Sequence, residues 1–211
     1  MRTVQTYCEV AGFDPAPECV QELFRLLDKW RGRRAPAGWL SVAFVSDATI
    51  CALHEEFLGD PSRTDVITFP GDDGTASTAT GDAAGGEPFA GEICVCVPQA
   101  RREARKRGTG VAGEVLLYLV HGWLHLTGLD DIAESDRAAM RAGEASALAW
   151  LSKRGFAPLW EDCRRSSGRK GASPEKTSQR RAHSTTKKAA ETSSTARAQR
   201  RASRSRRAVA P

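Results

Sequence analysis

The chain has 211 residues, 40% of them hydrophobic, and a formal net charge of +5, so length alone allows one or two domains. The charge is divided unevenly: residues 164–211 hold 15 Lys and Arg against two Glu, a net of +13, and the rest carries a net of −8. Bulky apolar residues are almost absent after Trp160, which excludes a second packed domain. We therefore expect one domain over residues 1–163 and a disordered basic tail over residues 164–211.

The cysteines and the apolar segments indicate the compartment. Six cysteines are scattered along the chain, the first ten residues lack the apolar core of a signal peptide, and no apolar run has the length of a membrane span. These features predict a cytoplasmic protein with reduced thiols and no membrane association. Cys94 and Cys96 lie two apart on a predicted strand and share one face, where core packing is their expected role.

Two kinds of hydrophobic spacing divide the chain into elements. Alternation or short apolar runs predict four strands, at residues 3–10, 39–45, 65–69 and 92–97. Helical spacing predicts five helices, at residues 17–30, 48–58, 99–106, 111–126 and 134–151. Asp47 is the expected N-cap of the second helix, and Ser135 or Glu134 that of the last. Residues 71–90 are rich in Gly, Ala, Asp and Thr and predict a long loop.

This order of elements predicts the fold class. Strands and helices do not alternate regularly, which favours α+β over a parallel α/β fold. We expect a small, mostly four-stranded sheet with about five packed helices. The apolar helix over residues 111–126 should lie at the centre and carry the site described next.

The sequence HGWLHLTGLDD, residues 121–131, predicts a metal site. Histidines four apart share one helix face, and Gly128 can end the helix in the left-handed conformation and turn the chain back. His121, His125 and Asp131 are the expected ligands, with Asp130 as the rival third ligand. Two imidazoles and one carboxylate leave a fourth tetrahedral position open, as catalytic zinc requires, so we expect one Zn²⁺ per chain. Gly122 stands where zinc proteases of the HExxH type have their general base, which argues against peptide hydrolysis.

Four segments in the same order resemble motifs of one family. Residues 121–131 resemble the HGxLHLxGYDH signature of the YbeY family, bacterial metal-dependent endoribonucleases that act in ribosomal RNA maturation. TDVITFP at residues 64–70 is similar to the family's TDVLSFP, LHEEFL at 53–58 to its LNxxYR, and AGEICVCV at 90–97 to its LGDIVIS. The resemblance covers residues 1–159 and implies an α+β fold in which the metal helix lines a cleft beside the sheet.

The chain departs from the family pattern at three positions. Asp131 replaces the usual third histidine, and Glu92 stands where the family has Asp. Leu58 replaces an Arg that the resemblance implies would contact RNA or the charge that develops on the phosphate. Arg63, on the loop before the next strand, is the candidate substitute for that cation.

The catalytic groups stay open at this stage. Arg63 and Glu92 are candidates, and Glu114 and Asp130 are further carboxylates that could transfer a proton. Attack by a metal-activated water and attack by the 2′-hydroxyl of the RNA are both compatible with the sequence.

The resemblance implies a single-strand-specific, metal-dependent endoribonuclease for maturation of the small-subunit rRNA 3′ end and for ribosome quality control. The expected partners are single-stranded RNA, precursor rRNA and ribosomal particles, and the basic tail should contact RNA phosphates. The alternative is a non-catalytic RNA-binding assembly factor with a structural zinc, which the loss of the family Arg at Leu58 keeps open.

Overall fold

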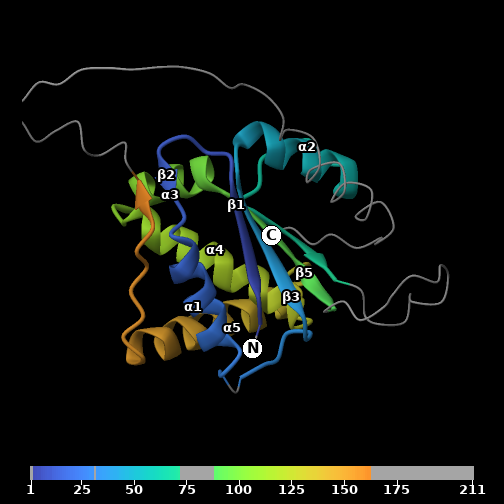
Figure 1. Cartoon of the computed structure of the whole chain (residues 1–211). Helices are drawn as coiled ribbons and strands as arrows, with labels where there is room; N and C mark the ends of the chain where they lie inside the picture. The colour runs from blue at the N-terminus through green and yellow to red at the C-terminus, as the bar shows by residue number, and fades with distance from the viewer. Residues whose placement is uncertain (1, 31, 72–87, 163–211) are drawn as a thin grey trace, which may run out of the picture.

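The fold is built on a four-stranded mixed sheet (Figure 1). A computed structural model of the chain describes residues 2–30, 32–71 and 88–162. The strand order is β1-β3-β5-β4, with bounds Val4–Cys8 for β1, Trp39–Val45 for β3, Phe89–Cys96 for β5 and Val66–Pro70 for β4. β1, β3 and β5 are parallel to one another, and β4 pairs antiparallel with β5 at the edge.

Helices cover the two sheet faces unequally. The helices are α1 (Pro17–Leu27), α2 (Asp47–Leu58), α3 (Val97–Arg107), α4 (Val111–Leu126) and α5 (Glu134–Lys153). The larger core joins side chains of α1, α4 and α5 to Val42, Phe44 and Ile93 on one face of the sheet. A smaller core packs Ile50 of α2 against Ala43 and Cys94 on the opposite face. The described part of the chain is therefore α+β, as predicted.

Most elements match the sequence expectation, and the differences lie at their ends. β3 and α4 have the predicted bounds, whereas β5 begins three residues earlier than expected and α3 begins at Val97. Ser46, not Asp47, caps α2 by accepting a hydrogen bond from the Thr49 N–H, so the expected cap was wrong. The side chain of Asp47 instead binds Arg102.

Further outcomes concern the start of α5 and the parts of the chain outside the main elements. Neither predicted residue caps α5, because its N-cap is Ala133, which has no capping side chain. A small antiparallel sheet of β2 (Phe13–Asp14) and β6 (Glu161–Asp162) was not predicted. Most of the expected loop at 71–90 and the whole tail at 164–211 lie outside the described residues. None of the described helices combines the length and hydrophobicity that crossing a membrane would require.

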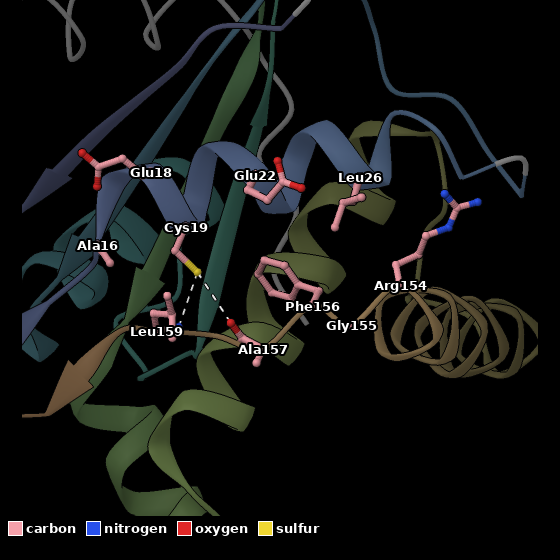
Figure 2. Close-up of a pocket in the computed structure, with 10 residues that line it drawn as sticks. All are labelled: Ala16, Glu18, Cys19, Glu22, Leu26, Arg154, Gly155, Phe156, Ala157 and Leu159. Atoms are coloured by element: carbon pink, nitrogen blue, oxygen red, sulfur yellow. Dashed lines mark hydrogen bonds between the residues drawn. The ribbon is translucent and has the colours of Figure 1, made fainter.

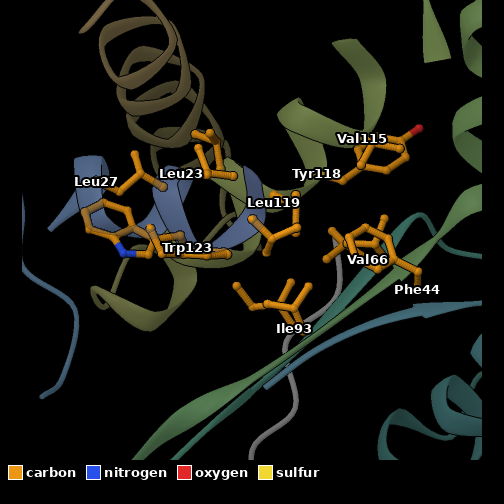
Figure 3. Close-up of a cluster of buried hydrophobic side chains, with 14 of the residues drawn as sticks. Leu23, Leu27, Phe44, Val66, Ile93, Val115, Tyr118, Leu119 and Trp123 are labelled. Carbon is orange, nitrogen blue, oxygen red and sulfur yellow. The ribbon is translucent and has the colours of Figure 1, made fainter. Parts of the chain in front are cut away.

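α4 is the central element because apolar side chains surround most of it. Leu119 points toward Ile93 of the sheet, and Trp123 lies beside Leu27 of α1 (Figure 3). On the sheet side, a Cβ at Gly122 would come within 2.6 Å of the Ile93 Cγ2 atom and 3.0 Å of the Thr68 Oγ1 atom. The absence of a side chain at Gly122 therefore lets α4 approach β4 and β5 closely, and this approach fixes the helix that carries both histidines.

Alanine substitutions at two glycines of α4 test whether the helix lies this close to the sheet. Gly122→Ala should lower the free energy of unfolding by about 1–3 kcal/mol, because the new methyl group overpacks the contact with the sheet. Gly113→Ala is the matched control, since nothing lies within 4 Å of a Cβ at that position. It should raise the stability by up to about 1 kcal/mol through helix propensity. Urea unfolding of both variants measures the difference, and equal effects would contradict the close approach.

Candidate metal centre

The two histidines of α4 face each other from successive turns. Both are buried, and their ring centroids are 4.6 Å apart. The Nε2 atoms of His121 and His125 are separated by only 2.8 Å. The four-residue spacing predicted from the sequence therefore brings two imidazole nitrogens to one point in a largely apolar surrounding.

The turn after α4 brings a carboxylate to the same point. Gly128 adopts the left-handed conformation, with φ of 86°, and the chain folds back as expected. Asp131 places its Oδ2 atom 3.7 Å from His121 Nε2 and its Oδ1 atom 3.9 Å from His125 Nε2. The ligand atoms of these three residues all lie within 4.8 Å of one another. Asp130 has a different contact, because its Oδ1 atom accepts the Asp131 backbone N–H at 2.8 Å.

The outer nitrogen of each ring is held by an acceptor. His125 Nδ1 lies 2.9 Å from the Leu129 carbonyl oxygen, and His121 Nδ1 lies 2.7 Å from Glu144 Oε1. A carbonyl oxygen and a carboxylate can only accept, so both rings carry their proton on Nδ1. In the neutral form of the two rings, both Nε2 atoms then carry lone pairs that face each other across 2.8 Å. Such an arrangement is repulsive unless a cation lies between the lone pairs.

The donor set fits a divalent metal ion. Two neutral imidazoles and one carboxylate are ligands that zinc accepts, and they leave a coordination position for water or substrate. Burial lowers the pKa of His125, and the positive charge of a protonated His121 lowers it further, so the neutral, ligating form of the ring is favoured. The side chain of Asp131 is 11% exposed, so solvent reaches only a small area of this carboxylate.

Comparison with known proteins assigns this arrangement to a family. The family model described as "Endoribonuclease YbeY" matches residues 14–152, which include all three residues of the metal centre and Glu144. The chain belongs to the YbeY family. The curated relatives named "Endoribonuclease YbeY" include proteins from Corynebacterium kroppenstedtii and Protochlamydia amoebophila, each 37% identical over 54% of this chain. These matches span 57% and 71% of the two relatives' own lengths.

Glu144 is the residue in contact with the histidine pair that sequence reasoning missed in this YbeY-family chain. It lies on α5, and it reaches His121 only because α5 packs on α4. Its neighbours at helical spacing, Met140, Ala147 and Leu151, are buried and apolar. An acid within an otherwise apolar helix stripe was the available signal, because such an acid needs a polar partner inside the fold.

Asp65, at the start of the TDVITFP segment, is a second missed carboxylate. Burial raises the pKa of the Asp65 carboxyl above its usual range. The positive form of His121 opposes that rise, so the two groups are close enough to interact. The Asp65 carboxyl also accepts the Val66 backbone N–H at 3.0 Å. A half-buried acid with a raised pKa therefore lies within electrostatic reach of His121.

Glu92 and Glu114 are not gathered at the histidines, and no described contact joins Arg63 to them. Glu92 alternates with Ile93 along β5 and so points to the α2 face, where it accepts a hydrogen bond from Ser41 at 2.7 Å. Arg63 is exposed on the loop before β4 and helps to lower the pKa of Asp47, after the larger effect of Arg102. Glu114 is buried and binds Arg107 at 3.0 Å and Thr109 at 2.9 Å, which makes it a structural acid at the α3–α4 junction.

A cavity elsewhere on the fold contains none of these residues. It measures about 400 Å³ and lies between α1 and residues 154–159 (Figure 2). Cys19 borders it and accepts the Leu159 backbone N–H at 3.4 Å through its sulfur. The lining side chains include no metal-ligand group other than Cys19 and two glutamates, Glu18 and Glu22. The metal centre and this cavity are therefore separate features.

Metal affinity tests the role of Glu144. Glu144→Gln keeps the size of the side chain and removes the charge that orients His121, so it should weaken zinc binding by about 10–100-fold. Asp131→Ala should lose more metal, and Asp130→Ala should lose almost none. Elemental analysis after dialysis against a competing chelator measures all three variants. Unchanged zinc retention in Glu144→Gln would show that the hydrogen bond to His121 is not needed for binding.

Proposed function

We propose that this chain is a metal-dependent endoribonuclease, with His121, His125 and Asp131 as ligands of one Zn²⁺ ion. The observation that carries the proposal is the pair of opposed Nε2 lone pairs beside a carboxylate, in a chain of a family whose relatives are named endoribonucleases. Zinc is the favoured ion because two imidazole nitrogens and one carboxylate oxygen suit its borderline-soft character.

The residues of the site have distinct tasks in this reaction. Zinc, when bound, would supply Lewis acidity that activates a nucleophile near neutral pH and polarises a phosphoryl oxygen. Glu144 and the Leu129 carbonyl keep the Nδ1 protons in place, so each Nε2 atom stays available as a ligand. Asp65, a half-buried carboxyl that interacts electrostatically with His121, is a further candidate to accept or return a proton. Water and the RNA 2′-hydroxyl are both compatible with this site as nucleophiles.

The fold supports some of the catalytic candidates from the sequence and argues against others. Arg63 remains a candidate for contact with the developing phosphate charge, since it is exposed and the loop that carries it leads into Asp65. Glu92 lies on the opposite face of the sheet from α4, so we give it no part in the reaction. Leu58, at 40% exposure, offers no charge to RNA.

The proposed substrate is single-stranded RNA in precursor rRNA and ribosomal particles, with maturation of the small-subunit rRNA 3′ end and ribosome quality control as the cellular tasks. Membership of the YbeY family supports an RNA substrate. A reducing cytoplasm is the proposed compartment, and the five described cysteines are all free thiols, which agrees with it.

A cleavage assay on single-stranded RNA tests the proposed activity. The zinc-loaded full-length protein should cut a labelled oligonucleotide, and chelation or His121→Ala should lower the rate by about 10²-fold or more, because the Lewis acid is lost. Asp130→Ala is the matched control and should keep both metal and activity. A zinc-loaded protein that binds the oligonucleotide without cutting it would favour the alternative, an RNA-binding assembly factor with a structural zinc.

The basic tail is proposed to add RNA affinity without sequence preference. Residues 164–211 carry a net charge of +13 and contain no aromatic residue on which a base could stack. A chain that ends at Cys163 should keep its zinc and bind RNA more weakly. The slope of log affinity against log salt should become shallower by about 0.7 for each phosphate that the tail neutralises in the full-length protein. An unchanged slope would mean that the tail does not contact RNA.

A further inference from the structure

The metal centre lies in a part of the chain with very few cations. Between Gly108 and Ser152, a stretch that includes the three candidate ligands, the only Lys or Arg residues are Arg137 and Arg141. This stretch of the chain therefore offers a polyanion such as RNA few positive side chains besides these two arginines. The same stretch contains six acidic residues: Glu114, Asp130, Asp131, Glu134, Asp136 and Glu144.

Arg137 is attached to the turn that carries the third ligand. Its Nη1 atom donates to the Ile132 carbonyl oxygen at 2.6 Å and lies 3.5 Å from the Asp131 carbonyl oxygen. The side chain is exposed, and no carboxylate in the described ranges forms an ion pair with it. Its guanidinium is thus bound next to a proposed zinc ligand, with N–H donors left for another acceptor.

Arg141 extends the same positive surface by one helical turn. It follows Arg137 by four residues on α5, so the two side chains lie on one side of the helix. Arg141 is exposed, and α5 is also the helix that directs Glu144 to His121. One helix therefore orients a proposed metal ligand through Glu144 and carries two exposed arginines within two turns of that residue.

Two arginines outside α5, Arg102 and Arg63, are less suited to this task. Arg102 is bound to both carboxylate oxygens of Asp47, at 2.6 and 2.8 Å. Arg63 lies close enough to Asp47 to lower its pKa, so part of its charge is already balanced. Neither has a described contact with the turn that holds Asp131.

We propose that Arg137, with Arg141 one turn further, binds RNA phosphate next to the bond on which the metal centre acts. An arginine suits this role because its planar fork can donate two parallel hydrogen bonds to one phosphate. The contact supplies positive charge at the edge of an otherwise acidic site. This assignment deepens the proposed nuclease function and rests on it.

The test measures RNA binding separately from cleavage. The probe is a fluorescent single-stranded RNA in which every 2′-hydroxyl is methylated, which prevents attack by the 2′-hydroxyl, and a denaturing gel after each titration checks that water has not cut it. The affinity of the zinc-loaded full-length protein is measured over a series of KCl concentrations. Arg137→Gln should weaken binding on the order of tenfold at low salt, because the variant cannot form the charge-assisted hydrogen bond. The salt slope should fall by about 0.7, as expected for one phosphate contact.

Three further variants separate a phosphate contact from other roles. Arg137→Lys should keep the salt slope while losing part of the affinity, since the charge remains and the planar fork does not. Arg141→Gln, which breaks no described hydrogen bond, should also lower the slope. Arg154→Gln removes one arginine at the far end of α5, where it lies over the Trp150 ring at 3.9 Å, and should leave RNA binding unchanged.

Several results would overturn the assignment. These are a wild-type salt slope in both Arg137→Gln and Arg141→Gln, an equally large effect in Arg154→Gln, or a loss of zinc that accounts for the weaker binding of Arg137→Gln. A slope that falls only in Arg63→Gln would move the contact to the loop before β4. Failure of the nuclease proposal would be seen in a different measurement: the zinc-loaded wild-type protein would not cleave unmodified RNA.

Discussion

The hydrogen bonds to the two Nδ1 atoms are the constraint on which the metal centre depends. The Leu129 carbonyl and the Glu144 carboxylate accept the Nδ1 protons, and this leaves two lone pairs opposed at 2.8 Å. The first acceptor is local, because the turn after α4 supplies it. The second requires α5 to dock on α4, and Gly143 allows this: a Cβ there would already be 3.2 Å from the Leu129 side chain. The geometry of the proposed ligands therefore depends on how α5 packs on α4.

This dependence explains which parts of the site the sequence predicts. His121, His125 and Asp131 belong to one helix and the turn that follows it, so helix periodicity and the conformational freedom of Gly128 were sufficient to place them. Glu144 comes from a separate helix, and Asp65 from the residue before the edge strand. Both depend on tertiary contacts between segments distant in sequence, which periodicity within one element does not encode. The fold class was predictable because it follows from the number and order of periodic segments.

The misplaced residues have an equally specific cause. Alternation along β5 fixes Glu92 and Ile93 on opposite faces, but only the packing of α4 against Ile93 shows which face is the metal side. The N-cap of α2 was assigned one residue late because Ser46 and Asp47 are both good capping residues. In the folded chain, Arg102 binds the Asp47 carboxylate, and the Ser46 hydroxyl makes the cap. The ion pair between Arg102 and Asp47, which are distant in sequence, therefore accompanies capping by Ser46, a choice that capping propensity alone left open.

In the proposed binding of RNA, the charge distribution assigns different parts to the tail and to α5. Exposed charges separated by more than about 8–10 Å are largely screened at physiological salt, so a basic segment without aromatic residues adds affinity but cannot set the position of one phosphodiester. A guanidinium bound to the carbonyl of Ile132 has a fixed place relative to Asp131. It can therefore align a strand with the metal centre at short range. An acidic domain with a net charge of −8 over residues 1–163 can act on RNA if distributed charge concentrates the strand and a few fixed cations position it. The arginines of α5 have the geometry for the second of these tasks.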